Sequence, residues 1–170
     1  MFRRGAVSVL LSVLIFAFLA CAGAVNSFEP IFCDAAKSFG ESALENCVYE
    51  LYLYRKSSGC KILSFNVSDI SEIKAEKLRL KNEVKGERLF IPESALKDFC
   101  LNENSIKNEI CSALNAEKAF EEKGEDFYNE YYYSKKIKTF LYINGKKVNF
   151  QVSVTRAGVS LSSPVAFGAY

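Results

Sequence analysis

Residues 138–154 read KTFLYINGKKVNFQVSV, and they contain the clearest structural signal in the chain. The pair Asn144-Gly145 favours the positive backbone angles of a type I′ turn, which joins two antiparallel strands. Apolar and polar residues alternate after the turn, as they do in a strand with one face on a core. The stretch therefore predicts a two-residue β-hairpin. The polar side chains of its second strand that we expect in water are Asn149, Gln151 and Ser153.

Helical signals precede this hairpin. Pro92 suits the first turn of a helix that continues to about residue 100, because its missing N–H costs nothing there. Apolar residues then recur with helical spacing, which predicts a second helix over residues 105–123. Further upstream, Asp69 and Glu72 are spaced as the caps of another short helix.

Strand signals are found in the same part of the chain. Residues 61–67 alternate between apolar and polar side chains, which predicts a strand. Residues 77–81 and 88–91 are separated by a turn that contains Gly86, and we expect them to pair as a hairpin. Residues 159–170 are small and apolar, which is typical of a short strand followed by a loose tail.

Residues 42–59 allow two interpretations. Ser42 and Glu45 are spaced as a helix capping box, and apolar residues follow with helical spacing as far as Gly59. Residues 48–54, VYELYLY, nevertheless have the composition of a strand. We favour the helix. Helices and antiparallel hairpins then combine in one compact α+β domain over residues 25–170, behind an N-terminal signal segment.

Residues 1–24 have the features of a secretory signal peptide. Arg3 and Arg4 are followed by an uncharged run over residues 6–19, AVSVLLSVLIFAFL. Small residues then give two A-x-A patterns, at residues 20–22 and 22–24. A positive start, an apolar middle and a small-residue end form the signature of such a segment. The sequence therefore predicts export from the cytoplasm.

Two alternatives to simple cleavage of this segment stay open. The uncharged stretch reaches Val25 and is about long enough to span a bilayer, so it could act as an uncleaved anchor. Residues 18–21, FLAC, also resemble a bacterial lipobox, with departures at Phe18 and Leu19. In that case Cys21 is the lipidation candidate, and the lipid would tether the domain to a membrane surface.

Charge and composition exclude several functions. Without Arg3 and Arg4, the remaining 20 basic residues equal the 20 acidic ones, so the basic surplus of a nucleic-acid-binding domain is missing. The chain contains no histidine, which excludes Ser-His-Asp and Cys-His catalysis within it and most catalytic zinc sites. Glycine-rich nucleotide loops are also missing. We expect no cofactor and no metal ion.

The cysteines predict disulfides in an oxidising compartment. Five of them follow the signal segment, which suggests two bridges and one unpaired thiol. Cys100 and Cys111 are the best pair, because they flank a short polar connection between two predicted helices. Two of Cys33, Cys47 and Cys60 would supply the second bridge, and the sequence leaves open which two. The odd thiol could form an intermolecular bridge or lie buried as a small apolar residue.

Motifs for catalysis are weak. Ser-x-x-Lys spacing occurs at Ser58/Lys61, Ser71/Lys74 and Ser94/Lys97, but the partner motifs of penicillin-recognising enzymes do not accompany it. The acidic residues between 117 and 130 lack the spacing of a calcium loop and fit a solvated surface better. A pair of carboxylates for hydrolysis could be assembled only by the fold. We expect a protein that is not an enzyme, with a small envelope hydrolase as the alternative.

An aromatic cluster gives the candidate binding face. Tyrosine offers a large contact area at low entropic cost, so a dense group of tyrosines can mark an interface. The candidates are Tyr128, Tyr131, Tyr132 and Tyr133. The sequence therefore predicts an exported binding or structural protein in the periplasm or on the membrane surface of a bacterium, or outside the cell. Its partner would be another envelope protein or a cell-wall component.

Overall fold

A computed structural model describes Phe32, residues 45–98 and residues 102–165 of the chain. The strands of its large sheet are β1 (Val48–Arg55), β2 (Gly59–Asn66), β3 (Val84–Pro92), β4 (Glu117–Lys123), β5 (Phe127–Tyr133), β8 (Phe150–Thr155) and β9 (Gly158–Ser163). A separate hairpin consists of β6 (Leu141–Ile143) and β7 (Lys146–Val148). The helices are α4 (Ile70–Arg79), α5 (Glu93–Asp98) and α6 (Glu103–Leu114), with a 3-10 turn, η2 (Val67–Asp69), before α4.

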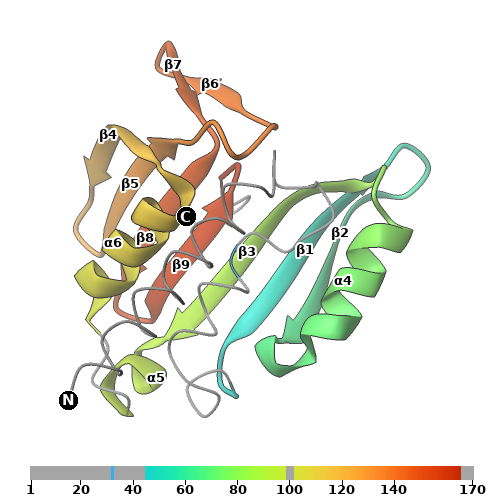
Figure 1. Cartoon of the computed structure of the whole chain (residues 1–170), viewed down its shortest axis with the longest axis horizontal. Helices are drawn as coiled ribbons and strands as arrows, with labels where there is room; N and C mark the ends of the chain where they lie inside the picture. Colours follow the sequence, from blue (N-terminus) through green and yellow to red (C-terminus); the bar gives the residue numbers. More distant parts are fainter. Residues whose placement is uncertain (1–31, 33–44, 99–101, 166–170) are drawn as a thin grey trace, which may run out of the picture.

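The seven strands form one antiparallel sheet in the order β2-β1-β3-β9-β8-β5-β4 (Figure 1). The domain is thus compact and mostly β, with few helices in its described part. The expected α+β mixture of hairpins and several helices is confirmed only in part, because two segments predicted to be helical belong to the sheet. The predicted signal segment lies outside the described residues.

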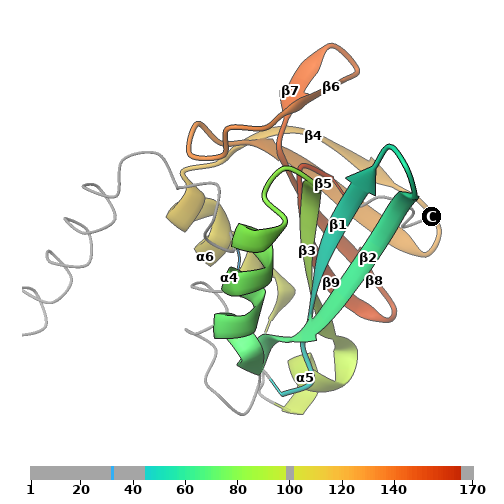
Figure 2. The same cartoon turned by 90° about the vertical axis from the view of Figure 1, so that its right-hand side faces the viewer.

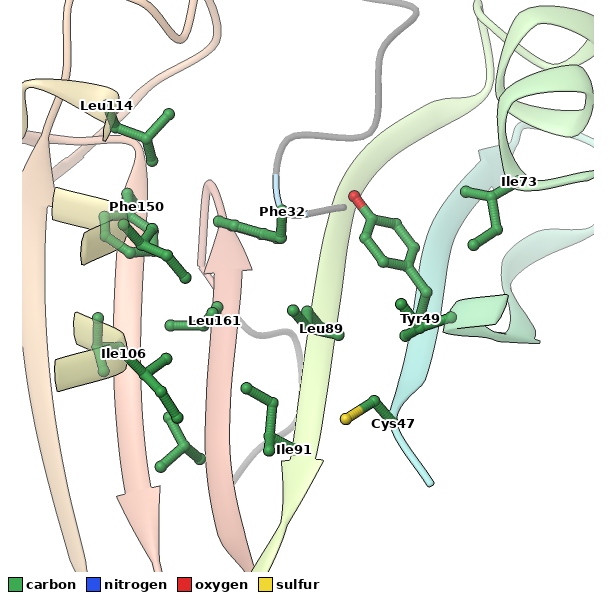
Figure 3. Close-up of a cluster of buried hydrophobic side chains, with 14 of the residues drawn as sticks. Phe32, Cys47, Tyr49, Ile73, Leu89, Ile91, Ile106, Leu114, Phe150 and Leu161 are labelled. Carbon is green, nitrogen blue, oxygen red and sulfur yellow. The ribbon is translucent and has the colours of Figure 1, made fainter. Parts of the chain in front are cut away.

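One face of the sheet carries the helices. Figure 2 shows α4 and α6 on the same side, and apolar side chains fill the layer between them and the sheet. Tyr49, Leu89 and Leu161 stand opposite one another on β1, β3 and β9 and are fully buried. Ile73 of α4 and Ile106 of α6 belong to the same buried cluster (Figure 3). This helix-covered layer is the core.

The other face of the sheet is polar. A row across it consists of Glu50, Arg88, Ser162, Gln151 and Tyr131, each opposite the next in register. Gln151 is 4% exposed and Ser162 1% exposed. The expectation that the polar side chains of the strand after Asn144-Gly145 lie in water is therefore wrong. Asn149, Gln151 and Ser153 are all buried.

Two predicted helices are corrected by the structure. Residues 48–55, which we assigned to a helix, form β1, because β2 and β3 pair with this segment on both sides. The helix predicted over residues 105–123 is real as far as Leu114 and then ends. Asn115 adopts the left-handed conformation there, with φ of 48°, and stops the helix as a C-cap. Residues 117–123 form β4 instead.

The predicted hairpin between residues 77–81 and 88–91 is wrong. Lys77 lies in the last turn of α4, while β3 pairs with β1 and β9. The other local predictions near it are confirmed. The strand over residues 61–67 is β2, the short helix after Asp69 is α4, and a helix, α5, follows Pro92. Pro92 itself ends β3 and does not lie in the first turn of α5, where it was predicted. The strand predicted after residue 159 is β9.

The Asn144-Gly145 turn is confirmed. Asn144 and Gly145 have φ of 50° and 73°, as a type I′ turn requires, and they join β6 to β7. The second strand is shorter than predicted, because β7 ends at Val148 and the chain enters the large sheet at Phe150. Within the described residues, no helix has the length and apolar character needed to cross a membrane.

Candidate functional site

The β6–β7 hairpin stands apart from the large sheet. In Figures 1 and 2 it projects beyond the ends of β4 and β5. One bond from its second strand reaches β4, where the Lys146 ammonium donates to the Ala119 carbonyl at 2.7 Å. Val148 at the end of β7 is also buried, whereas Leu141, Tyr142 and the turn are exposed and can meet something outside the domain.

Asn149 fixes the base of this hairpin. Its side chain is fully buried and accepts a hydrogen bond from the Ser134 N–H at 2.8 Å. Its amide group donates to the carbonyls of Ser134 and Ile137, at 2.7 and 2.9 Å. The Asn149 N–H donates to the Tyr132 carbonyl at 3.0 Å. These bonds join the chain segments that enter and leave the hairpin, so the hairpin projects in a defined direction.

Exposed apolar side chains gather on this hairpin. Tyr142 is 67% exposed, Phe140 39% and Leu141 36%. The rings of Phe140 and Tyr142 meet edge to face with centroids 5.6 Å apart, and Tyr133 adds a third ring 6.4 Å from Phe140. The Lys147 ammonium lies 4.7 Å from the centre of the Phe140 ring. The rings therefore form one ordered group with a cation beside it.

The charge of this region is one-sided. Residues 134–150 contain five lysines and no acidic residue. The ammonium of Lys136 donates to the Ala113 carbonyl at 2.6 Å, and Lys146 is held by β4 as described above. Lys146 is exposed although it is held in this way, and the other three lysines are exposed and donate to no backbone carbonyl within the described residues. We use the term hairpin surface for these three lysines and the aromatic group, namely Tyr133, Lys135, Lys138, Phe140, Leu141, Tyr142 and Lys147.

The neighbouring strands β4 and β5 carry the opposite charge. Between residues 117 and 130 there are six acidic residues and two lysines. The Glu130 carboxylate is nearly buried and lies 2.6 Å from the ammonium of Lys118 and 3.1 Å from that of Lys107 on α6. It also accepts a hydrogen bond from the Tyr132 hydroxyl. Burial alone raises the pKa of Glu130, but the bonds from Lys118, Lys107 and Tyr132 outweigh it and lower the pKa to about 2. This carboxylate is therefore ionised at neutral pH and fastens α6 to the sheet.

The four tyrosines proposed as a binding face do not share one face. Tyr131 and Tyr132 are consecutive on β5, so they point to opposite sides of the sheet, and both are buried. Tyr131 stacks on Phe120, whereas Tyr132 packs on Phe150 in the core. Tyr128 is half-buried and donates to Glu121. Tyr133 is half-buried too, and it is the one member of the four that belongs to the hairpin surface.

The cysteines are described in part. Cys47 is buried, Cys111 half-buried and Cys60 exposed, and the structure shows no disulfide among these three. Burial raises the pKa of the Cys47 thiol to about 11 and also raises that of Cys111. Both are therefore protonated at neutral pH, which makes them poor nucleophiles. Cys21, Cys33 and Cys100 lie outside the described residues, so the pairing of Cys100 with Cys111 stays a prediction.

The lysines of the Ser-x-x-Lys pairs are not buried, although Ser58 and Lys61 line one small hollow together. Of the lysines in the Ser-x-x-Lys pairs, Lys61 and Lys97 are exposed and Lys74 is half-buried. Two hollows beside β1 and β2 have volumes of about 60 and 250 Å³, and neither is lined by a pair of carboxylates. No group of three or more acidic or cysteine side chains in the described part is arranged to hold a metal ion.

A comparison of the chain with family models, with curated proteins and with solved structures found no match. The candidate site therefore rests on the geometry above. Sequence reasoning did not find the hairpin surface, although it found the turn that forms it. The available signal was the run of lysines without an acidic residue on both sides of Asn144-Gly145, interleaved with Phe140 and Tyr142.

Proposed function

We propose that this protein is an exported cell-envelope protein that acts by contact with an anionic partner in the envelope, and that the hairpin surface makes this contact. One observation carries the proposal. A rigidly based hairpin presents exposed aromatic side chains and three exposed lysines, and it contains no acidic residue. Aromatic residues are enriched in interfaces, and a patch of one charge selects a partner of the opposite charge.

The acidic residues of β4 and β5 also favour contact of an anionic partner with the hairpin surface. Because β4 and β5 carry an acidic surplus, an anionic partner is repelled from them and attracted to the hairpin beside them. The fold thus places a basic hairpin beside two acidic strands, in a domain whose basic and acidic residues are equal in number. Such a separation orients a binding domain without requiring a large net charge.

The location in the envelope rests on the N-terminal segment. Arg3, Arg4 and the uncharged run behind them support export, followed by cleavage, by lipidation at Cys21 or by retention as an anchor. Cell fractionation with the intact mass of the recovered protein distinguishes these three fates and counts the disulfides. Recovery of the uncleaved chain from the cytosol with all thiols reduced would contradict export.

Photo-cross-linking in cells tests the contact itself. A photoreactive phenylalanine analogue is placed at position 142 in place of Tyr142, and in a control chain at position 62 in place of Ile62. Ile62 is 51% exposed on β2, at the opposite edge of the sheet. We expect cross-links to envelope components from position 142 and few from position 62. Equal cross-linking from both positions, or none from position 142, would contradict the proposal.

A further inference from the structure

We infer that the partner of the hairpin surface is the headgroup region of an anionic phospholipid bilayer. This inference rests on the proposed function and names the partner's chemistry. It is carried by three properties of the hairpin: its small size, the type of its exposed side chains and the position of its lysines.

The small size of the hairpin favours a bilayer over a protein as its partner. Its strands have three residues each, so the side chains beyond the sheet offer a narrow ridge. Stable protein–protein interfaces bury roughly 1,200 to 2,000 Å² in total, which needs a broad complementary surface. A bilayer sets no such condition, because a ridge of apolar side chains can enter its interfacial region at any point.

The exposed side chains are those that suit a membrane interface. Tyr142 is the most exposed of the large hydrophobic residues described, and tyrosine places an apolar ring and a polar hydroxyl at the depth of the headgroups. Phe140 packs edge to face on Tyr142 and adds apolar surface without a polar group, and Leu141 is exposed on the opposite face of β6.

The lysines flank these apolar side chains. Lys138 precedes Phe140 by two residues, and Lys147 lies over its ring. In this arrangement the stems of the lysines can follow the rings while the ammonium groups stay among lipid phosphates. Each lysine near an anionic surface increases the binding constant roughly fivefold, so Lys135, Lys138 and Lys147 together give a preference of about 100-fold over a neutral surface.

The absence of tryptophan from the chain provides a sharp test. The Tyr142→Trp variant has a single indole on the hairpin, and the Ile62→Trp variant is the matched control on β2. Each protein, in the form recovered from cells, is mixed with vesicles of phosphatidylglycerol and phosphatidylcholine or of phosphatidylcholine alone. We expect the emission of Tyr142→Trp to shift to shorter wavelength with the anionic vesicles, and this shift to disappear in high salt. The emission of Ile62→Trp should not change.

The outcomes separate this inference from the function on which it rests. If Tyr142→Trp does not respond to anionic vesicles, or responds equally to neutral ones, the lipid assignment is overturned. If position 142 nevertheless cross-links in cells, the contact function stands and its partner is an acidic protein or polymer. If both measurements fail, the contact function is overturned too. Comparing Tyr142→Trp with Ile62→Trp also removes any effect of a shared N-terminal tether, which would act on both chains alike.

Discussion

The side chain of Asn149 and the backbone of Ser134 exchange two hydrogen bonds, of 2.8 and 2.7 Å, and so close the base of the β6–β7 hairpin. Ser134 precedes the hairpin and Asn149 follows it. The side-chain amide of Asn149 thus replaces a backbone hydrogen bond between strands at the point where the chain leaves β5 and later enters β8. This buried side chain therefore helps to fix the direction in which the hairpin projects.

Replacing Asn149 by leucine should therefore destabilise the domain. The Asn149→Leu variant leaves the Ser134 N–H and two buried carbonyls without their partner, at a cost of about 3 kcal/mol in the free energy of unfolding. Asn129→Leu is the matched control, because Asn129 is equally buried on β5 but its side-chain oxygen has no hydrogen-bond partner. We expect a clearly smaller loss for the control in urea unfolding. Equal losses would show that the bonds to Ser134 contribute little.

The buried carboxylate of Glu130 predicts a pH dependence. Its pKa is about 2 in the folded protein, below the ordinary value of 4.5, so folding favours the ionised form. The resulting stability is fully present above pH 4.5 and is lost as the pH falls towards 2. It amounts to about 3 kcal/mol.

The Glu130→Gln variant should lower the stability at neutral pH and flatten its decrease between pH 4.5 and 2. Urea unfolding at a series of pH values measures both effects. Glu109→Gln, on the exposed side of α6, is the control and should retain the slope of the unchanged protein. A variant at Glu130 with the same slope as the unchanged protein would contradict the role of this carboxylate.

A second buried ion pair fastens α4 to the sheet. The ammonium of Lys77 lies 2.7 Å from the carboxylate of Glu87, both side chains are 5% exposed, and the Tyr49 hydroxyl donates to the same carboxylate. Removing one charge leaves the other buried, so Lys77→Met should cost about 3 to 5 kcal/mol. Adding Glu87→Gln should restore most of this loss, since the amide is neutral and still accepts from Tyr49.

Lys97→Met is the control for this pair. Lys97 and Glu93 are an exposed pair on α5, and its loss should cost less than about 0.5 kcal/mol. Thermal or urea unfolding of the two single variants and the double variant supplies the comparison. A double variant as unstable as Lys77→Met alone would show that the loss comes from packing of the lysine stem and not from the charge of Glu87.

Local chemistry explains what could be predicted from the sequence. Asn144-Gly145 specifies its turn by its own backbone preferences, so the hairpin was found without knowledge of the rest of the fold. Asp69 and Pro92 likewise locate the starts of α4 and α5, although Asp69 makes no side-chain cap hydrogen bond and Pro92 is the last residue of β3. These elements depend on neighbours in sequence.

Long-range pairing explains the errors. Residues 48–55 have an ambiguous pattern, and they are a strand because β2 and β3 supply partners on both sides. Residues 117–123, EKAFEEK, have good helix formers, yet pairing with β5 makes them a strand. The signal that could have ended the predicted helix was Asn115, a residue that adopts the left-handed conformation readily.

In the candidate site, too, the sequence predicts the local features and misses those that depend on the rest of the fold. Alternation after Asn144-Gly145 correctly groups Gln151 with Ser153 on one face, but it does not reveal whether that face is covered. The tyrosines were chosen by density in the sequence, and neighbouring residues of a strand point to opposite sides. Exposure separates Tyr142 from Tyr131 and Tyr132, and exposure is a property of the folded chain.

Charge reversal on the hairpin surface examines whether this surface binds an anionic partner in the envelope. The Lys138→Glu/Lys147→Glu variant reverses two exposed charges on the hairpin, while Lys56→Glu/Lys61→Glu makes the same change in charge around the β1–β2 turn. Binding of each protein to isolated envelopes is measured across a range of salt concentrations. We expect the hairpin variant to lose most of the salt-sensitive binding and the β1–β2 variant to retain it. Equal binding by the two variants would show that the hairpin surface does not make the contact.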